Sequence, residues 1–235
     1  MCGLGIVVDV VIPAYNEAAS IGLVLADLAG TGVRRVVVAD NNSTDATAAV
    51  AAAGGAEVVS APRQGYGSAC LAGIAHLRHT GPPEVVVFVD ADHSDHADEL
   101  PDLVAPIAAG RAELVIGSRV LGRREPGSLL PQARIGNAVA TLMMRALYGA
   151  RFTDLGPFRA LRWTTLERLG MRDPDFGWTA EMQVKAARLG VPWAEVPVSY
   201  RRRVGVSKIT GTLSGTVRAG VKIITTILRY SRRRH

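Results

Sequence analysis

The sequence predicts a single-domain α/β protein with a mostly parallel central sheet flanked by helices. Short runs rich in valine alternate with alanine-rich stretches of helical composition, which is the pattern of repeated strand–helix–strand units. The valine-rich runs are apolar throughout, as expected of strands buried on both faces of a parallel sheet. The chain has 235 residues, of which 48% are hydrophobic, and this is enough for one sizeable core.

The elements follow in order along the chain, without an internal repeat or a domain linker. In the first half we predict strands near 5–12, 34–39, 56–60, 84–90 and 112–117, separated by helices near 17–29, 44–54, 67–79 and 98–109. Ser43 or Thr44 and Ser68 are candidate N-caps of the second and third helices. After residue 120 comes the connection LGRREPGSLLP, followed by predicted helices at 132–148 and 178–189, a strand at 193–199 and a last helix near 211–231.

The charge balance indicates an anionic partner. Lys and Arg number 27 against 21 Asp and Glu, giving a net charge of +6, which suits phosphate, nucleic acid or an acidic bilayer. Cys2 and Cys70 have neither disulfide nor metal-ligand spacing, which suits a reducing compartment. The N-terminus carries Asp9 inside its apolar run and reads as a strand, not a signal peptide. No stretch reaches the roughly 20 uninterrupted apolar residues of a membrane-spanning helix, so we expect a protein that does not span a membrane.

Polar residues cluster where three of the first four predicted strands end. The fourth strand ends at Asp90-Ala91-Asp92, and the first and second end in the sequences PAYNE (13–17) and DNNSTD (40–45). Ligands bind beyond the carboxyl ends of parallel strands, so these clusters should face one ligand. Two carboxylates separated by a small residue can hold a divalent cation that carries a diphosphate. Taken alone, the Asp-Ala-Asp motif is also explained by a helix N-cap followed by a solvated loop.

Together these motifs resemble the family 2 glycosyltransferases of the GT-A fold. The family has PAYNE-like, DDGSTD-like, DAD and GSR motifs where this chain reads PAYNE, DNNSTD, DAD and GSR, and the likeness continues through TDLGPFRA, FGWTAEMQ and YRRRVGVSK. The chain is most similar to the dolichyl-phosphate mannose synthase type, which transfers a sugar from a nucleotide donor to a polyprenyl phosphate. The resemblance implies a GT-A catalytic domain over 1–210 and an amphipathic basic helix over 211–235.

The resemblance also implies which residues bind the nucleotide sugar. The first motif would surround the base and ribose, the second would reach the base, and the turn RQGYGS would lie under the nucleotide. The implied donor-binding residues are Pro13, Ala14, Tyr15, Glu17, Asp40, Asn41, Gly67, Asp90, Ala91 and Asp92. Asn41 stands where the family has a second aspartate, so its role is open. Alternatively, Pro13 and Tyr15 form an ordinary turn with a packed ring, and the glycine turn is a plain helix-entry loop.

The resemblance places the two carboxylates of the Asp-Ala-Asp motif across the donor diphosphate. Asp92 would be the principal ligand of Mg²⁺ or Mn²⁺, and Asp90 would support the metal and the sugar, because a cation neutralises charge on the departing nucleoside diphosphate. His93, Asp95 and His96 also suggest zinc, but zinc needs three or four converging ligands and this loop does not guarantee them. We expect them to be solvated, with Asp95 as a candidate outer partner of the metal.

Two basic segments would complete the catalytic site with Asp92. Arg119 follows a strand end and offers its planar fork to a phosphate, or else forms a surface salt bridge. The segment RRRVGVSK resembles a mobile loop that closes on the donor, and its Arg202, Arg203, Ser207 and Lys208 would meet the diphosphate and the acceptor phosphate. Which of its three arginines points inward is open. A run of charge is otherwise a solvated face.

The acceptor decides the mechanism. A polyprenyl phosphate is already anionic, so its direct in-line attack on the anomeric carbon needs no strong base, and inversion is expected. If the acceptor is instead a hydroxyl of a saccharide or small molecule, Asp154 or Glu181 would take its proton. Glu181 also fits a plain amphipathic helix. The acceptor side therefore comprises Arg119, Asp154, Glu181 and Ser207.

The C-terminal helix favours a lipid acceptor. Residues 213–231 are apolar with Arg218, Lys222 and Arg229 at intervals, and the basic run 232–234 (Arg232, Arg233 and Arg234) follows. Such a helix can lie in an anionic membrane interface, and docking on the protein's own core is the alternative. We expect peripheral contact with the cytoplasmic membrane face.

Rival classes explain fewer of the motifs. A haloacid-dehalogenase-like phosphatase also places Asp-x-Asp after an apolar strand, but on an early strand, and it leaves PAYNE and DNNSTD unexplained. A nucleotidyltransferase should open with a glycine-rich basic loop. A nucleic-acid binder has no use for carboxylates gathered on one edge, so we expect no nucleic-acid partner. The sequence names neither base nor hexose, and GDP-mannose and UDP-glucose both remain candidate donors.

Overall fold

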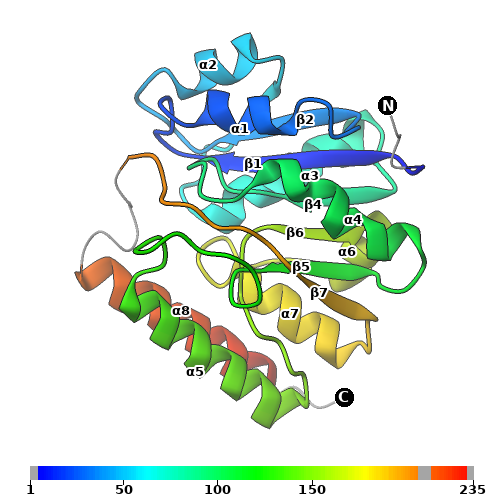
Figure 1. The fold of residues 1–235 in the computed structure, drawn as a ribbon, viewed down its shortest axis with the longest axis vertical. Coiled ribbons are helices and arrows are strands. Elements are labelled where there is room, and N and C mark those ends of the chain that lie inside the picture. The colour runs from blue at the N-terminus through cyan, green and yellow to red at the C-terminus, as the bar shows by residue number, and fades with distance from the viewer. Residues whose placement is uncertain (1–4, 206–212, 232–235) are drawn as a thin grey trace.

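The computed structural model describes residues 5–205 and 213–231. Its centre is a seven-stranded sheet in the order β3-β2-β1-β4-β6-β5-β7 (Figure 1). β6 is antiparallel to both of its neighbours, and the other pairs are parallel. The strands are β1 (Val8–Ala14), β2 (Arg35–Asp40), β3 (Glu57–Ser60), β4 (Val85–Phe88), β5 (Leu114–Ser118), β6 (Arg159–Arg162) and β7 (Trp193–Pro197).

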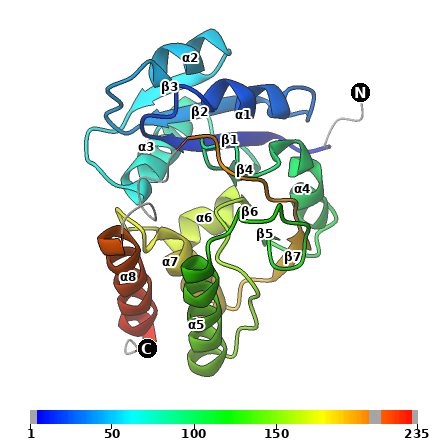
Figure 2. The same ribbon diagram turned by 60° about the vertical axis from the view of Figure 1, so that its left-hand side comes forward.

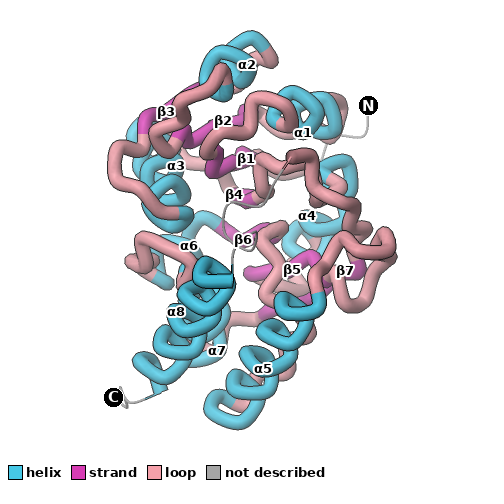
Figure 3. The backbone as a smooth tube through the Cα atoms, turned by 90° about the vertical axis from the view of Figure 1, so that its left-hand side faces the viewer, coloured by secondary structure: helices cyan, strands magenta, loops and turns pink. Residues whose placement is uncertain are grey.

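Helices cover both faces of the sheet (Figure 3). The helices of one face are α1 (Ile21–Leu28), α2 (Thr47–Ala53) and α4 (Leu100–Ala108), the last preceded by a 3-10 turn at Ala97–Glu99. The helices of the other face are α3 (Tyr66–Thr80), α5 (Pro131–Tyr148), α6 (Trp163–Leu169), α7 (Trp178–Arg188) and α8 (Leu213–Ser231). Successive strand residues point to opposite faces, so Val10 joins the first core and Val11 the second. The predicted α/β fold is confirmed.

The sequence does not predict β6 and α6. β6 has four residues, with arginine at both ends, so it lacks the apolar run that marks the other central strands. Arg159 is nevertheless fully buried in it, because its guanidinium donates to the main-chain oxygens of Leu155, Gly156 and Thr179. Leu155 and Gly156 lie just before the strand and Thr179 lies on α7, and the residue pattern of β6 does not reveal these main-chain contacts.

The predicted N-caps are wrong. Ser43 and Thr44 lie before the first residue of α2, and Ser68 lies inside α3. Ser43 Oγ instead accepts a hydrogen bond from Asn16 N at 2.9 Å, which joins the turns after β1 and β2. Ser68 Oγ donates to Pro174 O at 3.1 Å. These side chains connect loops at one edge of the sheet instead of ending helices.

α8 packs against the body of the protein, beside α5 and α7 (Figure 2). Ile227 is fully buried, and the Tyr148 hydroxyl at the end of α5 donates to its main-chain oxygen. Tyr230 Oη donates to Glu181 Oε1 on α7 at 2.6 Å. The inner side of α8 therefore docks on the protein's own core, which was the alternative to a membrane contact. Within the described ranges, no helix has the length and apolar character needed to cross a bilayer.

Candidate active site

The carboxyl ends of β1 and β4 lie side by side and open into a pocket of about 380 Å³. The motif after β1, the Asp-Ala-Asp motif, the start of α3 and one arginine of the basic segment form its walls. The lining residues are Pro13, Ala14, Tyr15, Glu17, Asn41, Gln64, Gly65, Tyr66, Ala69, Asp90, Ala91, Asp92, Asp175, Phe176 and Arg203. Polar strand ends from distant parts of the sequence thus face one cavity, as the strand pattern predicts.

Asp90 and Asp92 are the pocket's candidate ligands for a cation. Asp92 is buried, and its Oδ1 accepts hydrogen bonds from Ser94 N at 2.9 Å and from Ser94 Oγ at 2.5 Å. Asp90 Oδ1 is buried and has no hydrogen-bond partner among residues 5–205 and 213–231. Buried acceptors are nearly always satisfied in native proteins, so this oxygen is a strong candidate to bind a ligand.

Repulsion among the neighbouring carboxylates of Asp90, Asp92 and Asp95 also favours binding of a cation. Burial, and then the negative charge of Asp92, raises the pKa of Asp90 to about 7. Burial, followed by the charges of Asp90 and Asp92, holds the pKa of Asp95 well above its usual range. Asp95 Oδ1 is also buried, again without a partner in the described part of the chain. A divalent cation would relieve this crowding of carboxyl groups.

The residues present fit a hard divalent cation and do not fit zinc. Carboxylate oxygens suit Mg²⁺ and Mn²⁺, and the two carboxylates of the motif could hold such an ion together with diphosphate oxygens. Across the ranges that the structure describes, no three His, Cys, Asp or Glu side chains are arranged to hold a metal by themselves. His93 Nε2 lies 3.1 Å from Asp27 Oδ2 and His96 Nδ1 lies 3.7 Å from Asp98 Oδ1, so both histidines pair outside the pocket.

Arg203 is the arginine that reaches the pocket. Its Nη1 lies 3.2 Å from Asp92 Oδ2, and its Nη2 donates to Glu17 Oε1 at 3.1 Å. Ser20 Oγ donates to the other oxygen of Glu17 at 2.9 Å. Val204 N donates to Asp92 O at 3.0 Å, so the main chain is also held at this point. A guanidinium therefore bridges the first motif and the Asp-Ala-Asp motif.

The neighbouring arginines point elsewhere. Arg201 pairs with Asp27 on α1. Arg202 donates from its main-chain N to Glu125 Oε2 at 2.8 Å, and its guanidinium bonds to the same connection after β5. Of the two arginines predicted to face the site, Arg203 lines the pocket and Arg202 does not.

Five predicted residues lie outside the described part of the chain. They are Ser207 and Lys208 of the basic segment and Arg232, Arg233 and Arg234 of the tail. Their contacts with phosphate groups and with a membrane stay predictions.

The hydrogen bonds of Asn41 explain why this chain has an amide where the DDGSTD-like motif has its second aspartate. Its Nδ2 donates to Ala61 O at 2.8 Å and to Arg63 O at 2.7 Å, while its Oδ1 accepts from Gly65 N at 2.8 Å. The buried amide thus satisfies two acceptors and one donor, whereas an ionised aspartate can only accept. Asn41 therefore holds the turn 61–65, whose end forms one wall of the pocket.

Asp40, the predicted contact to the base, ends β2 beside the pocket but does not line it. Its Oδ1 is buried and makes no hydrogen bond within the described ranges. Its Oδ2 accepts a long bond of 3.4 Å from Ser43 N. Asp40 thus keeps an acceptor near the pocket edge.

The glycine turn packs against a loop that the sequence does not place at the site. A Cβ added to Gly67 would lie 2.0 Å from Asp173 O, so glycine allows α3 to approach the loop 173–176. This approach puts Asp175 and Phe176 in the pocket wall. Gly67 itself does not line the pocket, and its position under the nucleotide stays a prediction. The sequence DPDF carries a turn signal but nothing that indicates a ligand.

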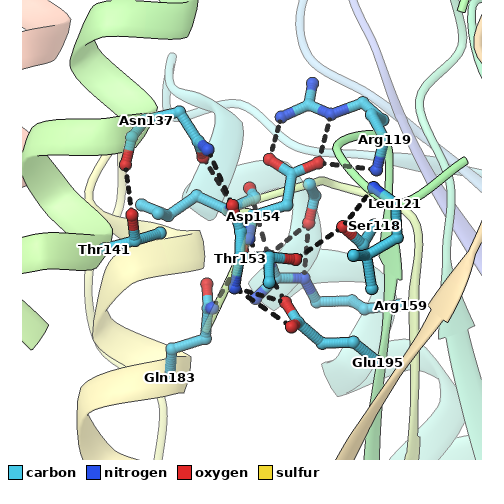
Figure 4. Close-up of polar contacts among 12 residues, drawn as sticks. Ser118, Arg119, Leu121, Asn137, Thr141, Thr153, Asp154, Arg159, Gln183 and Glu195 are labelled. Atoms are coloured by element: carbon cyan, nitrogen blue, oxygen red, sulfur yellow. Dashed lines mark hydrogen bonds and ion pairs between the residues drawn. The ribbon is translucent and has the colours of Figure 1, made fainter. Parts of the chain in front are cut away.

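Arg119 and Asp154 form a buried ion pair (Figure 4). Arg119 Nε and Nη2 donate to Asp154 Oδ2 at 2.8 Å and Oδ1 at 2.7 Å, and Arg119 N donates to Oδ2 at 2.8 Å. Burial alone would lower the pKa of Arg119, but the Asp154 carboxylate outweighs it and raises that pKa. The surface salt bridge offered as an alternative is wrong, because the pair lies inside the protein. The guanidinium fork of Arg119 is bound to Asp154, where the sequence predicted a phosphate.

The loop that carries Asp154 is fixed from three sides (Figure 4). Glu195 on β7 accepts hydrogen bonds from Thr153 N at 2.9 Å and Asp154 N at 3.2 Å. Asn137 Nδ2 on α5 donates to Thr153 O at 2.9 Å, and Gln183 Nε2 on α7 donates to Asp154 O at 2.9 Å. Burial raises the pKa of Glu195. These bonds hold Asp154 in place for Arg119.

Glu181 joins α7 to its surroundings. Its Oε2 accepts from the main-chain N of Arg172 at 3.0 Å and of Asp173 at 2.7 Å, and its Oε1 accepts from Tyr230 and lies 2.8 Å from Lys185 Nζ. Burial favours its neutral form, but hydrogen bonds from Lys185, Tyr230 and the two amides lower its pKa overall. Both oxygens are therefore used within the fold, and Glu181 does not line the pocket.

A second pocket of about 580 Å³ lies between α5 and the connection after β5. Apolar side chains and two arginines form most of its wall. It shares Asn137 and Thr153 with the network that holds Asp154 (Figure 4). The lining residues are Val120, Arg124, Leu129, Pro131, Arg134, Ile135, Asn137, Ala138, Thr141 and Thr153.

Known proteins resemble the chain over most of its length. The family model described as glycosyl transferase family 2 matches residues 9–170. An uncharacterised glycosyltransferase from Mycobacterium tuberculosis is 43% identical over 216 residues, covering 91% of this chain and 94% of that protein. The undecaprenyl-phosphate mannosyltransferase of Micrococcus luteus is 32% identical, covering 87% of this chain and 88% of that protein.

A solved structure confirms the predicted GT-A type of fold. Glucosyl-3-phosphoglycerate synthase from Mycobacterium tuberculosis, crystallised with Mn²⁺, UDP-glucose and phosphoglyceric acid, is 26% identical with a TM-score of 0.77. The match covers 98% of this chain and 81% of that one.

Proposed function

The chain belongs to glycosyl transferase family 2, and on that premise we propose that it moves a hexose from a nucleoside-diphosphate sugar to a polyprenyl phosphate, inverting the anomeric carbon. As a glycosyltransferase it needs a donor pocket, an acceptor site and a way to stabilise the leaving diphosphate. The family assignment leaves the phosphatase alternative without support.

The donor fits the pocket at the carboxyl ends of the strands. Tyr15 and Glu17 supply a ring and a carboxylate for the base and ribose, and the Asp-Ala-Asp carboxylates are placed for a diphosphate-bound Mg²⁺ or Mn²⁺. The bound cation would neutralise charge that develops on the leaving diphosphate. Arg203 already lies beside Asp92 and would add a guanidinium to the same phosphate groups. Lys208 and Ser207 are proposed to join it, with Lys208 acting on the leaving group.

A phosphate acceptor is favoured because both candidate bases, Asp154 and Glu181, are already held in ion pairs and hydrogen bonds. A hydroxyl acceptor must lose a proton to a base, whereas a phosphate attacks as an anion. Asp154 accepts three hydrogen bonds from Arg119, and Glu181 accepts from four donors. Neither carboxylate is available as a proton acceptor in this arrangement. A reaction that needs no base therefore suits the site better.

The second pocket supports a lipid-phosphate acceptor. Leu129, Ile135 and Ala138 offer an apolar wall to an isoprenoid chain, and Arg124 and Arg134 offer charge to its phosphate. The mannosyltransferase of Micrococcus luteus, whose name specifies undecaprenyl phosphate, adds a related protein with such an acceptor. We propose that the Arg119–Asp154 pair, next to this pocket, orients the loop through which the acceptor phosphate approaches.

A membrane-embedded acceptor requires the enzyme to work at a lipid surface. We therefore propose peripheral contact with the cytoplasmic face of an anionic membrane, using the C-terminal segment 211–235, which follows the catalytic domain 1–210 and includes α8. The net charge of +6 supports attraction to such a surface. Clustered carboxylates at the pocket oppose binding of nucleic acid there.

A small phosphorylated hydroxy acid is the second candidate acceptor. It is favoured by the likeness to glucosyl-3-phosphoglycerate synthase crystallised with phosphoglyceric acid. Transfer to its hydroxyl would require a base, and the two candidates predicted from the sequence, Asp154 and Glu181, would first have to leave their ion pairs.

Product analysis distinguishes the two acceptors. The full chain is incubated with GDP-mannose or UDP-glucose, Mn²⁺ or Mg²⁺, and either a short water-soluble polyprenyl phosphate or 3-phosphoglycerate, and the products are weighed by mass spectrometry. We expect a hexosyl polyprenyl phosphate with inverted configuration, and no product when EDTA is in excess. Transfer to 3-phosphoglycerate alone would contradict the lipid acceptor and leave the family assignment intact.

A further inference from the structure

The outward side of α5 is apolar. Ile135, Val139 and Leu142 are 66%, 41% and 64% exposed, whereas Ala140 and Met144 face the core. These three positions recur at helical spacing, so they form one stripe on the side opposite the core. An exposed helix face normally carries charged and polar side chains, and an apolar one indicates a contact surface.

α8, the neighbour of α5, also has one buried side and an exposed apolar stripe. Val221, Ile224 and Leu228 are 55%, 36% and 39% exposed, while Ile227 is fully buried against the core. The two helices lie side by side at one end of the molecule (Figures 1 and 2). Two adjacent helices thus each bury one side and expose a second apolar stripe.

The charged residues of α5 and α8 are all basic. Neither residues 126–153 nor residues 196–235 contain an Asp or a Glu. On α5 the exposed Arg134 and Arg145 flank the stripe, and on α8 the exposed Arg218 and Arg229 do the same. An apolar stripe with arginines along its flank suits the boundary between acyl chains and anionic headgroups.

We propose that the exposed stripes of α5 and α8 form a lipid-docking surface, here called the two-helix surface, whose partner is an anionic bilayer. This inference rests on the proposed function, because a lipid acceptor requires such a surface. It moves the main membrane contact from the basic run at the end of the chain to α5. A second copy of the chain is a poorer partner, because pairing two such surfaces would bring arginines together with no acidic side chains from these helices to balance them.

Docking in this way would place the second pocket at the bilayer. Ile135 and Ala138 belong both to α5 and to that pocket. A phosphate head entering between Arg124 and Arg134 would therefore leave its isoprenoid chain in or near the membrane. The surface thus determines how the acceptor reaches the enzyme, while the donor pocket stays at the edge of the sheet.

Vesicle sedimentation of the full chain tests the two-helix surface without any substrate. Vesicles contain phosphatidylcholine alone or an equimolar mixture with phosphatidylglycerol. We expect binding to the mixed vesicles, a loss of about fivefold or more for Val139→Gln/Leu142→Gln, and a loss of about fivefold for Arg145→Gln on the mixed vesicles. These residues do not line either pocket, so melting temperature and UDP binding should not change.

Leu23→Gln is the matched control. Leu23 is a 45% exposed leucine of a helix, but α1 lies at the opposite end of the molecule from α5 (Figure 1). It should bind vesicles like the unmodified protein. Equal binding by the α5 variants, or no binding by the unmodified chain, would overturn the inference. Size-exclusion chromatography is run in parallel, and a dimer lost in Val139→Gln/Leu142→Gln would instead identify the surface as an interface between copies.

The inference and the proposed function can fail separately. Vesicle binding without transfer to any polyprenyl phosphate would retain the two-helix surface and reject the acceptor. Transfer to a water-soluble polyprenyl phosphate without vesicle binding would retain the acceptor and reject the surface. If both hold, Val139→Gln/Leu142→Gln should lower transfer to a long-chain acceptor in vesicles by about fivefold and leave transfer to the short acceptor unchanged.

Discussion

The sheet edge that carries the proposed donor pocket is called the donor edge here. Its carboxylates differ from the carboxylates beside α5 and α7 in how completely their oxygens are hydrogen-bonded. At the donor edge, Asp40, Asp90 and Asp95 each keep a buried oxygen with no partner in the described residues. Beside α5 and α7, Asp154 and Glu181 are each saturated by a cation and by N–H or O–H donors. The difference shows that burial alone does not identify a functional carboxylate. An oxygen without a partner in the described residues marks a place where a ligand can bind, whereas Asp92, bonded to Ser94 and paired with Arg203, shows that a candidate ligand can also have partners.

The largest effect should come from the donor edge. We expect Asp92→Asn to lower kcat/KM by about 10³-fold or more, because one carboxylate oxygen that would face the diphosphate-bound cation is lost. The melting temperature should change little, since relief of the repulsion with Asp90 offsets the lost ion pair with Arg203. Steady-state kinetics and thermal unfolding measure both. Asp98→Asn, an exposed aspartate near the same loop, should keep its activity. A large fall in stability for Asp92→Asn would place it with the structural carboxylates.

The next effect should come from the buried ion pair. Arg119→Gln leaves the Asp154 carboxylate buried without its cation and should lower the free energy of unfolding by about 3–5 kcal/mol. The matched control is Arg78→Gln, whose pair with Glu167 is exposed at 55% and 40%, and which should lose less than about 1 kcal/mol. Urea unfolding measures both variants. Equal losses would mean that burial does not separate the two pairs.

The comparison also predicts a pH dependence at the donor edge. In metal-free protein the pKa of folded Asp90, about 7, lies above the ordinary aspartate value of 3.8, so the folded state binds more protons than the unfolded state between these values. The free energy of unfolding should therefore fall as pH rises from about 4 to about 7. Asp90→Asn should remove this contribution, stabilising the protein at pH 8 more than at pH 4 in thermal unfolding with EDTA. A variant that gains equally at both pH values would contradict the raised pKa.

The smallest effect concerns the satisfied amide beside the donor pocket. Asn41→Asp replaces two N–H donors by acceptors that face carbonyl oxygens, and it should cost about 1–3 kcal/mol of unfolding free energy. Nucleotide binding, measured by calorimetry, should weaken as the turn 61–65 loosens. The neighbouring Asn42→Asp removes one exposed hydrogen bond and should stay within about 0.5 kcal/mol. Unchanged nucleotide affinity in Asn41→Asp would separate the turn from the pocket.

The sequence predicts the donor edge well because its signals are local. Each valine-rich run predicts a strand by itself, and the polar residues at 13–17, 40–45 and 90–92 come at the ends of three of these runs. Parallel topology then brings the strand ends together, as the lining of the pocket shows. The motif PAYNE and the Asp-Ala-Asp motif both line the pocket for this reason.

The remaining features depend on contacts between distant segments. Phe176 reaches the pocket because Gly67 lets α3 approach its loop, and neither residue indicates the other in the sequence. Arg203 and Arg202 are adjacent in a basic run, yet only the course of the main chain over the Asp-Ala-Asp motif decides that Arg203 turns inward. Strand β6 lacks an apolar pattern because it contains a buried arginine, whose main-chain acceptors include Thr179 O, 20 residues away. Tertiary bonding of this kind leaves no periodic pattern to read.

The bridge from Arg203 to Asp92 and Glu17 has a consequence for the order of binding. A free divalent cation approaching Asp92 would meet a guanidinium at 3.2 Å, and the two positive charges would repel. A cation that arrives already complexed with the nucleotide brings phosphate oxygens to which Arg203 can transfer its hydrogen bonds. We therefore expect cation and nucleotide to enter as one complex, and Mn²⁺ alone to bind weakly. When the diphosphate departs, Arg203 can return to the two carboxylates, so the same side chain that admits the donor complex also resets the site for the next turnover.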